Sequence, residues 1–476
     1  MKKHFASVAL LLSSVVFSLA VEISSPNTNL TEIEQQIVAA ARVKSSFTFA
    51  HTGKLAATPP MGWNSYDAFG DSVTEDETLA NAAWMKEHLL AIGWDTVVVD
   101  FRWYDPQPTG DDRLLNKTRV RAALTADEFS RLLPSTNRFP SATNGIGFKP
   151  LADKLHAMGL KFGIHVMRGI PRQAVLTNSP ILGGKFSAGD AGDANDKCTW
   201  CPDMFGVRDN AAGQVWYDSC AKLWASWDVD YIKVDDLSEP YHTSEIEQLR
   251  RALDKHGKKI VFSTSPGPTT TSHAGHIAAH ANLWRISGDF WDRWQKLNEQ
   301  FDLLAQWQGA GGAGHWPDAD MIPIGKIALR SKLGGNPHWT HFTRDEQRTL
   351  ISLWSLAPSP LMLGMNLPDN DAWTTALLTN PEVIAVNQDA LGKPALRKFR
   401  AGQGAEVWTR ELTGGAHAVG FFNRTGQAAT TDFEWIKNGF CAMPKVRNLW
   451  LRKDLPTSEK FSAEIPPHSS VLLRVE

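Results

Sequence analysis

The sequence predicts an α/β fold in which a (β/α)₈ TIM barrel is followed by a small C-terminal antiparallel β-sandwich. Eight short apolar runs alternate with helical patterns between residues 55 and 390, which is the pattern of such a barrel. From residue 391 to residue 476 the runs become β-like and are separated by Gly, Asn and Pro, as in a sandwich. The chain has 476 residues, so a barrel of about 250 residues or somewhat more leaves room for this second unit.

The first 20 residues have the pattern of a secretory signal peptide. Lys2 and Lys3 precede an apolar run, and Ser18 and Ala20 supply the small residues of a cleavage site. We therefore expect cleavage near Ala20 and a secreted or periplasmic protein. Residues 21–54, rich in Ser, Thr and Asn around a short helix-like run, are predicted to form an N-terminal tether.

The predicted strands of both units are short runs bounded by turn residues. The barrel strands are expected at residues 61–64, 96–100, 161–166, 231–235, 259–265, 282–287, 314–321 and 360–365. The sandwich strands are expected at residues 405–410, 416–423, 447–451 and 469–475. Thr74-x-x-Glu77 and Thr343-x-x-Glu346 are capping boxes that begin helices, and Gly93 ends the first of these helical runs. The intervals after the second and third strands are long, which predicts expanded loops there.

The composition narrows the classes of function. The chain carries 49 Lys+Arg and 51 Asp+Glu, a formal charge of −2, which excludes a polybasic nucleic-acid binder. No apolar stretch beyond the signal peptide is long enough to cross a membrane, so neither nucleic acid nor membrane is an expected partner. There are 19 Trp but only 5 Tyr. Most of these indoles are expected in the core, and the others offer flat faces on which sugars stack.

Polar residues stand where several predicted strands end, at the edge where barrel enzymes carry their active sites. Lys233 and Asp235 are two residues apart and share a face of one strand, and a lysine this close keeps a carboxylate ionised. Asp289 follows the sixth strand and supplies a second carboxylate. Taken singly, these residues have plainer interpretations as a structural ion pair and a helix cap. Their joint occurrence at different strand ends favours an active site with two catalytic carboxylates, as in glycoside hydrolases.

Six motifs then indicate a family. They are Thr58-Pro-Pro-Met-Gly-Trp63-Asn-Ser, Gly159-Leu-Lys-Phe-Gly-Ile164, Asp230-Tyr-Ile-Lys-Val-Asp235, Trp284-Arg285-x-x-x-Asp289, Trp316-x-Asp-x-Asp320-Met321 and Ala385-Val-Asn-Gln-Asp389. With them the chain resembles glycoside hydrolase family 27, the α-galactosidase or melibiase family. The resemblance implies a retaining double displacement with Asp235 as nucleophile and Asp289 as acid/base. It also implies that five residues contact the substrate: Trp63, Asp100, Lys233, Arg285 and Asp320. Trp63 is expected to stack on the sugar.

Three positions depart from the family pattern. In many α-galactosidases of the family a second aspartate follows the strand-two aspartate and the pair binds the 4-OH and 6-OH, whereas Phe101 follows Asp100 here. Phenylalanine accepts no hydrogen bond and fills the space beside C5, which favours β-L-arabinopyranose, an α-D-galactose without its hydroxymethyl group. His165 stands where much of the family has Tyr, and Ser265 stands at the expected contact with the sugar's 2-substituent.

The principal prediction is an exported, retaining exo-glycosidase that removes terminal α-D-galactosyl residues from an oligosaccharide or polysaccharide (an α-galactosidase). A β-L-arabinopyranosidase with the same catalytic pair is the alternative, and a non-catalytic glycan-binding protein is the alternative of another class. No cofactor and no metal is expected, because a retaining glycosidase works with two carboxylates and water.

Other groups of possible metal ligands have plainer interpretations. His273, His276 and His280 stand at helical spacing, where a solvated helix face is the commoner outcome. The acidic loop at residues 190–196 lacks the spacing of an EF-hand. Cys198-x-x-Cys201 allows a local disulfide, whereas zinc would need two more ligands.

Overall fold

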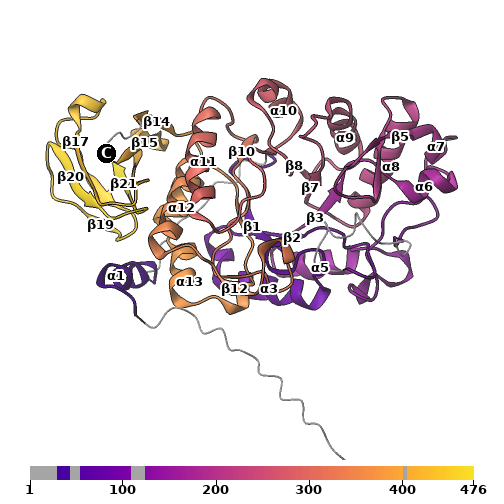
Figure 1. Ribbon diagram of the computed structural model, residues 1–476, viewed down its shortest axis with the longest axis horizontal. Helices are drawn as coiled ribbons and strands as arrows, with labels where there is room; N and C mark the ends of the chain where they lie inside the picture. The colour runs from indigo at the N-terminus through magenta and orange to yellow at the C-terminus, as the bar shows by residue number, and fades with distance from the viewer. Residues whose placement is uncertain (1–28, 43–53, 109–123, 400–404) are drawn as a thin grey trace, which may run out of the picture.

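A computed structural model describes residues 29–42, 54–108, 124–399 and 405–476. The described chain is elongated, with the C-terminal β-domain at one end, the barrel in the middle and a lobe built from an expanded loop at the other end (Figure 1). The predicted signal peptide lies outside the described residues. Among the helices that are described, none is long and apolar enough to cross a membrane.

The centre of the described chain is an eight-stranded parallel sheet, as predicted. Its strands lie in the order β10-β9-β8-β7-β3-β2-β1-β13. Their bounds are β1 (Met61–Asn64), β2 (Thr96–Val99), β3 (Lys161–Met167), β7 (Tyr231–Asp235), β8 (Val261–Thr264), β9 (Leu283–Arg285), β10 (Trp316–Asp318) and β13 (Leu361–Leu363). Strands β1 and β2 are buried at every residue, as expected where helices cover the outside of a parallel sheet. Gly62 is required for their close approach, because a Cβ there would lie 2.0 Å from the Thr96 carbonyl oxygen.

The two edge strands of this sheet meet beyond the end of β10. Ile322 forms a parallel bridge with Leu363. Its N–H donates to the Met362 carbonyl at 2.7 Å, and its own carbonyl accepts from the Gly364 N–H at 3.2 Å. The sheet therefore closes into a barrel through residue 322, and Asp320, at φ 84°, lies in the segment just before the closure.

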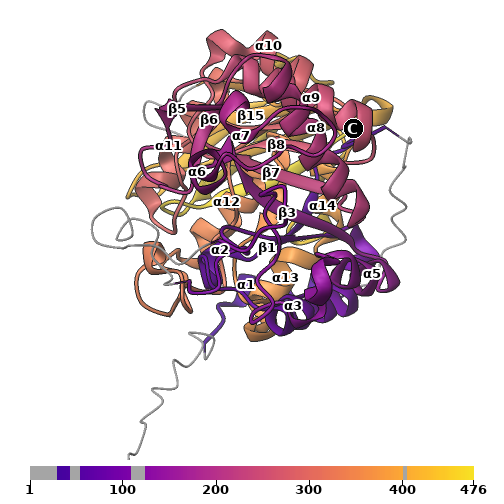
Figure 2. The same cartoon turned by 90° about the vertical axis from the view of Figure 1, so that its right-hand side faces the viewer.

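Helices surround the barrel, as Figure 2 shows along the long axis. Both predicted capping boxes are present, at Thr74 before α3 and at Thr343 before α12. The helices from β1 onward that cover the barrel or follow its strands are α2 (Tyr66–Phe69), α3 (Glu75–His88), α5 (Lys149–Ala157), α8 (Ala211–Ser226), α9 (Thr243–His256), α10 (Ala274–His280), α11 (Trp294–Gln306), α12 (Arg344–Leu356), α13 (Ala372–Thr379) and α14 (Pro381–Asn387). Short 3₁₀ turns are η1 (Leu90–Ile92), η2 (Pro140–Gly145), η3 (Thr271–His273), η4 (Lys332–Gly334), η5 (Leu367–Asp369), η6 (Thr413–Gly415) and η7 (Ile436–Asn438).

Two insertions extend from the end of the barrel at which the C-terminal ends of the strands lie. The expected expansion after β3 forms the lobe, with β4 (Ile170–Pro171), α6 (Arg172–Thr177), α7 (Ala188–Ala191), β5 (Gly192–Lys197) and β6 (Met204–Val207). The strands of the lobe pair antiparallel in the order β4-β6-β5. A smaller hairpin of β11 (Lys326–Ile327) and β12 (His338–Trp339) follows β10.

The C-terminal domain consists of two antiparallel sheets, in agreement with the predicted sandwich. The larger sheet contains β14 (Leu396–Phe399), β15 (Glu406–Glu411), β16 (His417–Phe422), β21 (Ser470–Val475), β18 (Val446–Asn448) and β19 (Lys453–Asp454), in that order. The smaller one pairs β17 (Ala429–Glu434) with β20 (Lys460–Ile465). Apolar side chains from both sheets form their common core, including Val407, Phe421, Phe433, Trp435 and Ile465.

Residues 29–42, part of the predicted tether, contain a helix, in keeping with the helix-like run in the sequence. Helix α1 (Glu32–Ala41) begins at a capping box on Thr31. It lies beside α13 (Figure 1), and its Ile37 and Val38 are buried. Glu34 forms an ion pair with Arg344 at 2.8 Å. This part of the segment is therefore docked on the barrel.

Candidate active site

A cavity of about 540 Å³ lies at the C-terminal ends of the barrel strands. This is the size and position of a small-ligand site in a barrel enzyme. The structure brings most of the predicted site residues to its wall: Asp100, Phe101, His165, Lys233, Asp235, Arg285, Asp289 and Asp320. Trp63 and Ser265 do not line it.

The Asp235 carboxylate is held on both oxygens. Oδ1 accepts from the backbone N–H of Asp236 at 2.6 Å, and Oδ2 lies 3.0 Å from Nε2 of His165. Burial raises the pKa of Asp235 to about 6, against the opposing effects of His165 and Lys233. The carboxyl is therefore mostly ionised at neutral pH and poorly solvated, as a carboxylate nucleophile requires.

Lys233 is paired with a different carboxylate from the one that the sequence pattern indicates. Its Nζ donates to Oδ2 of Asp100 at 2.9 Å, and Nδ2 of Asn64 donates to the same oxygen at 2.6 Å. Burial would raise the pKa of Asp100, but Lys233, His165 and Asn64 together lower it to about 2. Asp100 is thus a permanent anion beside an ammonium, and the pair offers acceptors and donors to neighbouring sugar hydroxyls.

Arg285 organises the opposite side of the cavity. Its Nη2 lies 2.7 Å from Oδ2 of Asp320 and 3.5 Å from Oδ1 of Asp289, and its Nη1 donates to Oγ of Ser265 at 3.2 Å. Burial raises the pKa of Asp320 to about 6, although Arg285 opposes this. The side chain of Asp289 is 50% exposed, so this carboxylate is open to solvent at the rim. Ser265 thus acts on the site through Arg285 rather than from the cavity wall.

Trp63 does not occupy the stacking position expected for it. The indole is fully buried, and its Nε1 donates to the Met365 carbonyl at 2.7 Å. Tyr66, three residues later and beyond the end of β1, lines the cavity instead. The expected stacking role therefore does not fit Trp63, and Tyr66, just after that motif, is the aromatic residue that lines the cavity.

Further wall residues were not anticipated from the sequence. Trp200 comes from the lobe and Trp291 from the loop that also carries Asp289, so both aromatic rings lie where a ligand enters. Asp67 lies deeper, and its Oδ2 is buried without a hydrogen-bond partner. Burial holds the pKa of Asp67 well above its ordinary range. None of these three residues follows a strand directly, which is the signal on which the sequence prediction depended.

Phe101 forms an apolar part of the wall beside Asp100. Its ring packs edge-on against His165 at 5.3 Å between centroids and lies 5.6 Å from the ring of Trp200. Behind it are Met167, Met204, Cys198 and Cys201. The local disulfide that the cysteine spacing allows is not formed, and the Cys201 N–H donates to Sγ of Cys198 at 3.3 Å.

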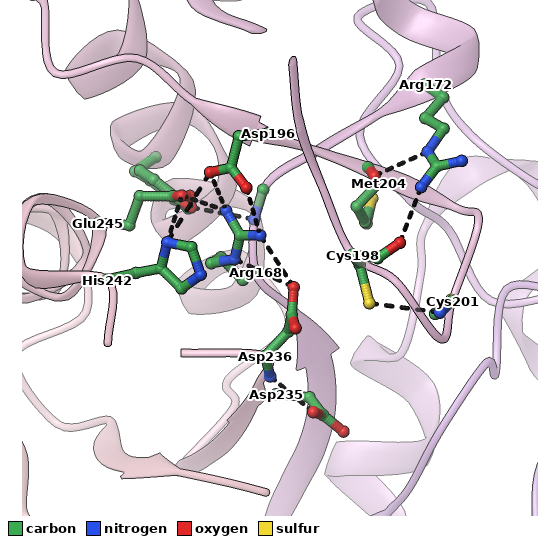
Figure 3. Close-up of polar contacts among 12 residues, drawn as sticks. Arg168, Arg172, Asp196, Cys198, Cys201, Met204, Asp235, Asp236, His242 and Glu245 are labelled. Carbon is green, nitrogen blue, oxygen red and sulfur yellow. Dashed lines mark hydrogen bonds and ion pairs between the residues drawn. The ribbon is translucent and has the colours of Figure 1, made fainter. Parts of the chain in front are cut away.

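A buried arginine lies behind the Asp235 strand, as Figure 3 shows. Two nitrogens of Arg168 donate to Oδ2 of Asp236, at 3.1 and 2.9 Å. The same guanidinium pairs with Asp196 at 2.7 Å and Glu245 at 2.6 Å. Asp236 has a φ of 64°, the left-handed region, which a non-glycine residue adopts only when its surroundings impose it. Arg168 thereby holds the residue whose N–H orients Asp235.

Comparisons with known proteins agree with this site. A family model described as alpha galactosidase A matches residues 206–389, and one described as the alpha galactosidase C-terminal beta sandwich domain matches residues 402–475. An α-galactosidase of Oryza sativa subsp. japonica is 30% identical over 423 residues, 87% of this chain and 84% of the relative. An α-galactosidase A of Cellvibrio japonicus is 28% identical over 449 residues, 89% of this chain and 93% of the relative.

Among solved structures, a family 27 β-L-arabinopyranosidase from Geobacillus stearothermophilus is 46% identical and superposes with a TM-score of 0.84, covering 88% of this chain and 97% of that one. A variant of that enzyme was solved in complex with arabinose. The motifs, the barrel with its sandwich domain and the full-length relatives together establish that the chain belongs to glycoside hydrolase family 27, the α-galactosidase or melibiase family, and is a glycoside hydrolase.

Proposed function

We propose that the protein is an exported, retaining exo-glycosidase that prefers terminal β-L-arabinopyranosyl residues. Phe101 carries the proposal, because this residue presents an apolar ring beside Asp100 in the cavity wall. β-L-Arabinopyranose and α-D-galactose share the ring hydroxyl pattern and differ by the hydroxymethyl group on C5. A galactose 6-OH placed beside this ring would lose its hydrogen bonds to water without gaining others, which is costly.

The proposed chemistry assigns one role to each carboxylate. Asp235 attacks the anomeric carbon while Asp289 gives a proton to the departing glycosidic oxygen, which leaves a glycosyl ester on Asp235. Asp289 then takes a proton from water, and the resulting attack at the anomeric carbon releases the sugar and restores Asp235. The burial of Asp235 and the exposure of Asp289 support this assignment. Asp100, Lys233 and the Arg285–Asp320 pair hold the sugar hydroxyls.

α-Galactosidase activity is the second candidate, favoured by the curated relatives that carry this name at about 30% identity. The ion pair between Asp100 and Lys233 supports this candidate as well, because it offers a hydrogen-bond acceptor and donors to the hydroxyls of either sugar. The natural substrate in either case is an oligosaccharide or polysaccharide with terminal arabinopyranose or galactose.

The deciding measurement compares kcat/KM on p-nitrophenyl β-L-arabinopyranoside and p-nitrophenyl α-D-galactopyranoside. We expect the arabinoside to be preferred by about 10- to 200-fold, the range that one small group in a closed pocket gives. Phe101→Asp should shift the ratio toward the galactoside, whereas the control Phe101→Leu, which keeps an apolar wall, should not. A wild-type preference for the galactoside would overturn the arabinopyranosidase proposal.

Two further outcomes test the other parts of the proposal. Sugar binding without hydrolysis of either glycoside would indicate the glycan-binding alternative. Export is tested by expressing the full chain and sequencing the N-terminus of the protein recovered outside the cytoplasm, where a start at Val21 is expected. Retention of the full N-terminus inside the cell would contradict it.

A further inference from the structure

Two histidines of α10 and one glutamate of α9 converge on the outer surface of the barrel. The sequence places His273, His276 and His280 at helical spacing. In the structure His273 turns away and stacks on Tyr241, with centroids 3.9 Å apart. Its place beside the other two rings is taken by Glu247, and the ligand atoms of Glu247, His276 and His280 all lie within 4.8 Å of one another.

One nitrogen of each imidazole is held by a tyrosine hydroxyl or a backbone carbonyl, and the other nitrogen of His276 lies 3.4 Å from Oε1 of Glu247. Nδ1 of His280 lies 2.7 Å from the His276 carbonyl oxygen, so this nitrogen is the protonated one. Nδ1 of His276 lies 2.6 Å from Oη of Tyr241. Such bonds to the second nitrogen fix the ring orientation of metal-binding histidines.

We propose that Glu247, His276 and His280 form a binding site for a divalent transition-metal ion, with zinc as the best match. Two imidazoles and one carboxylate are a common donor set for zinc, with water completing a tetrahedron. Bonds of about 2.0–2.2 Å in a tetrahedron place neighbouring ligand atoms about 3.3–3.6 Å apart. Nε2 of His276 and Oε1 of Glu247 are 3.4 Å apart, which matches this spacing. The rings of His276 and His280 are stacked with centroids 4.2 Å apart, so they turn toward each other when they bind one ion.

Two other clusters of this kind in the described part of the chain are less suitable. In the cluster of Asp196, His242 and Glu245, the guanidinium of Arg168 already supplies the positive charge (Figure 3). In the cluster of Asp292, His338 and His341, Oδ2 of Asp292 already accepts the His341 backbone N–H at 2.7 Å. At Glu247, by contrast, Arg251 binds the second oxygen, Oε2, and leaves Oε1 facing His276.

The proposed ion would join α9 to α10 and stiffen the segment between β7 and α9. Tyr241 lies in this segment, six residues after Asp235, and contacts the site through His276. None of the three ligands lines the substrate cavity. We therefore expect zinc to raise the thermal unfolding midpoint while kcat/KM changes little.

The test is calorimetric titration of the chelator-treated, full-length protein with zinc chloride. We expect one saturable site and a zinc-dependent rise in the unfolding midpoint. His280→Ala should weaken binding at least 100-fold and abolish that rise, and Tyr241→Phe, which loses only an orienting bond, should weaken it about 10-fold. His273→Ala, at the end of η3 just before α10, is the control, because this ring is turned away from the three ligand atoms, and it should bind like wild type.

Glu247→Gln keeps the shape of the side chain but removes its charge, so it separates ligand loss from misfolding and should also weaken binding. Hydrolysis of the preferred glycoside reports that each variant is folded. Absence of a saturable site, or equal weakening in His273→Ala and His280→Ala, would overturn the proposal. These outcomes are independent of the sugar preference, so either proposal can fail without the other.

Discussion

The two carboxylates of the active site are held in opposite ways. Asp235 is 7% exposed at its side chain and is fixed on both oxygens, by the Asp236 N–H and by His165. Asp289 is 50% exposed and has one charged contact, Arg285 at 3.5 Å. A nucleophile must meet one carbon at a fixed angle, whereas an acid/base gives its proton to the departing oxygen and regains one from water in each turnover. The difference in burial therefore matches the difference in proposed roles.

The largest expected effect comes from removing the buried member of the pair. Asp235→Ala leaves no atom to form the glycosyl ester, so kcat/KM on p-nitrophenyl β-L-arabinopyranoside should fall by about 10⁴-fold or more. Added azide should restore turnover by attacking the vacated face, with inversion at the anomeric carbon. A variant that hydrolyses the glycoside near the wild-type rate would break the assignment of the two roles.

Removing the exposed carboxylate, Asp289, should lower kcat/KM by less than removing Asp235. The size of the decrease should depend on the leaving group. Asp289→Ala removes the proton donor, so glycosides with poor leaving groups should lose about 10²- to 10⁴-fold in kcat/KM. Aryl glycosides with acidic phenols need no protonation to depart and should lose far less in the first step. The measurement is kcat/KM across a series of aryl leaving groups, and a uniform loss would contradict an acid/base role.

A conservative substitution can test whether Arg168 positions Asp235 through its bonds to Asp236. Arg168→Lys keeps the positive charge but cannot form the two bonds that hold Asp236 in its left-handed conformation, so Asp235 loses its orientation. We expect kcat to fall by about 10- to 100-fold with KM little changed. Arg208→Lys is the matched control, because Arg208 is exposed and binds only the backbone carbonyls of Gly189 and Asp190. Equal losses in the two variants would show that Arg168 has no special positioning role.

The residues of the active site show which features can be predicted from a sequence pattern. Asp100, Lys233 and Asp235 were predicted because polar residues at the ends of apolar strands are readable as a local pattern. Trp63 and Tyr66 show the limit of this reasoning. Trp63 lies inside its motif and Tyr66 directly follows it, and the strand ends at Asn64. The buried Trp63 packs in the core, whereas Tyr66 lines the cavity. Lys233 and Asp235 lie within β7 and also line the cavity, so the position relative to the strand end does not by itself decide which residue faces a ligand.

Contacts between distant segments are the part that no local pattern predicts. Arg168 joins Asp196, Asp236 and Glu245, which are separated from it by 28 to 77 positions in the chain. The barrel itself was predictable because most of its strands carry an apolar run with turn signals, the polar stretch at residues 314–321 being the exception. The closure through Ile322 was not, since it depends on where the chain runs after β10.

The smallest expected effect is on stability. Replacing Asp235 with Asn should stabilise the fold, although it removes the proposed nucleophile. The pKa of Asp235, raised to about 6 by burial, lies above the ordinary value of 3.8. Between those pH values the folded state binds a proton that the unfolded state has lost, so stability falls as the pH rises. At pH 7 the ionised carboxyl therefore costs the fold up to about 3 kcal/mol, and Asp235→Asn should remove this cost. Thermal unfolding should show a midpoint about 2–5 °C above wild type at pH 7, with the difference vanishing near pH 4. A constant difference at both pH values would mean that the gain does not come from the buried charge.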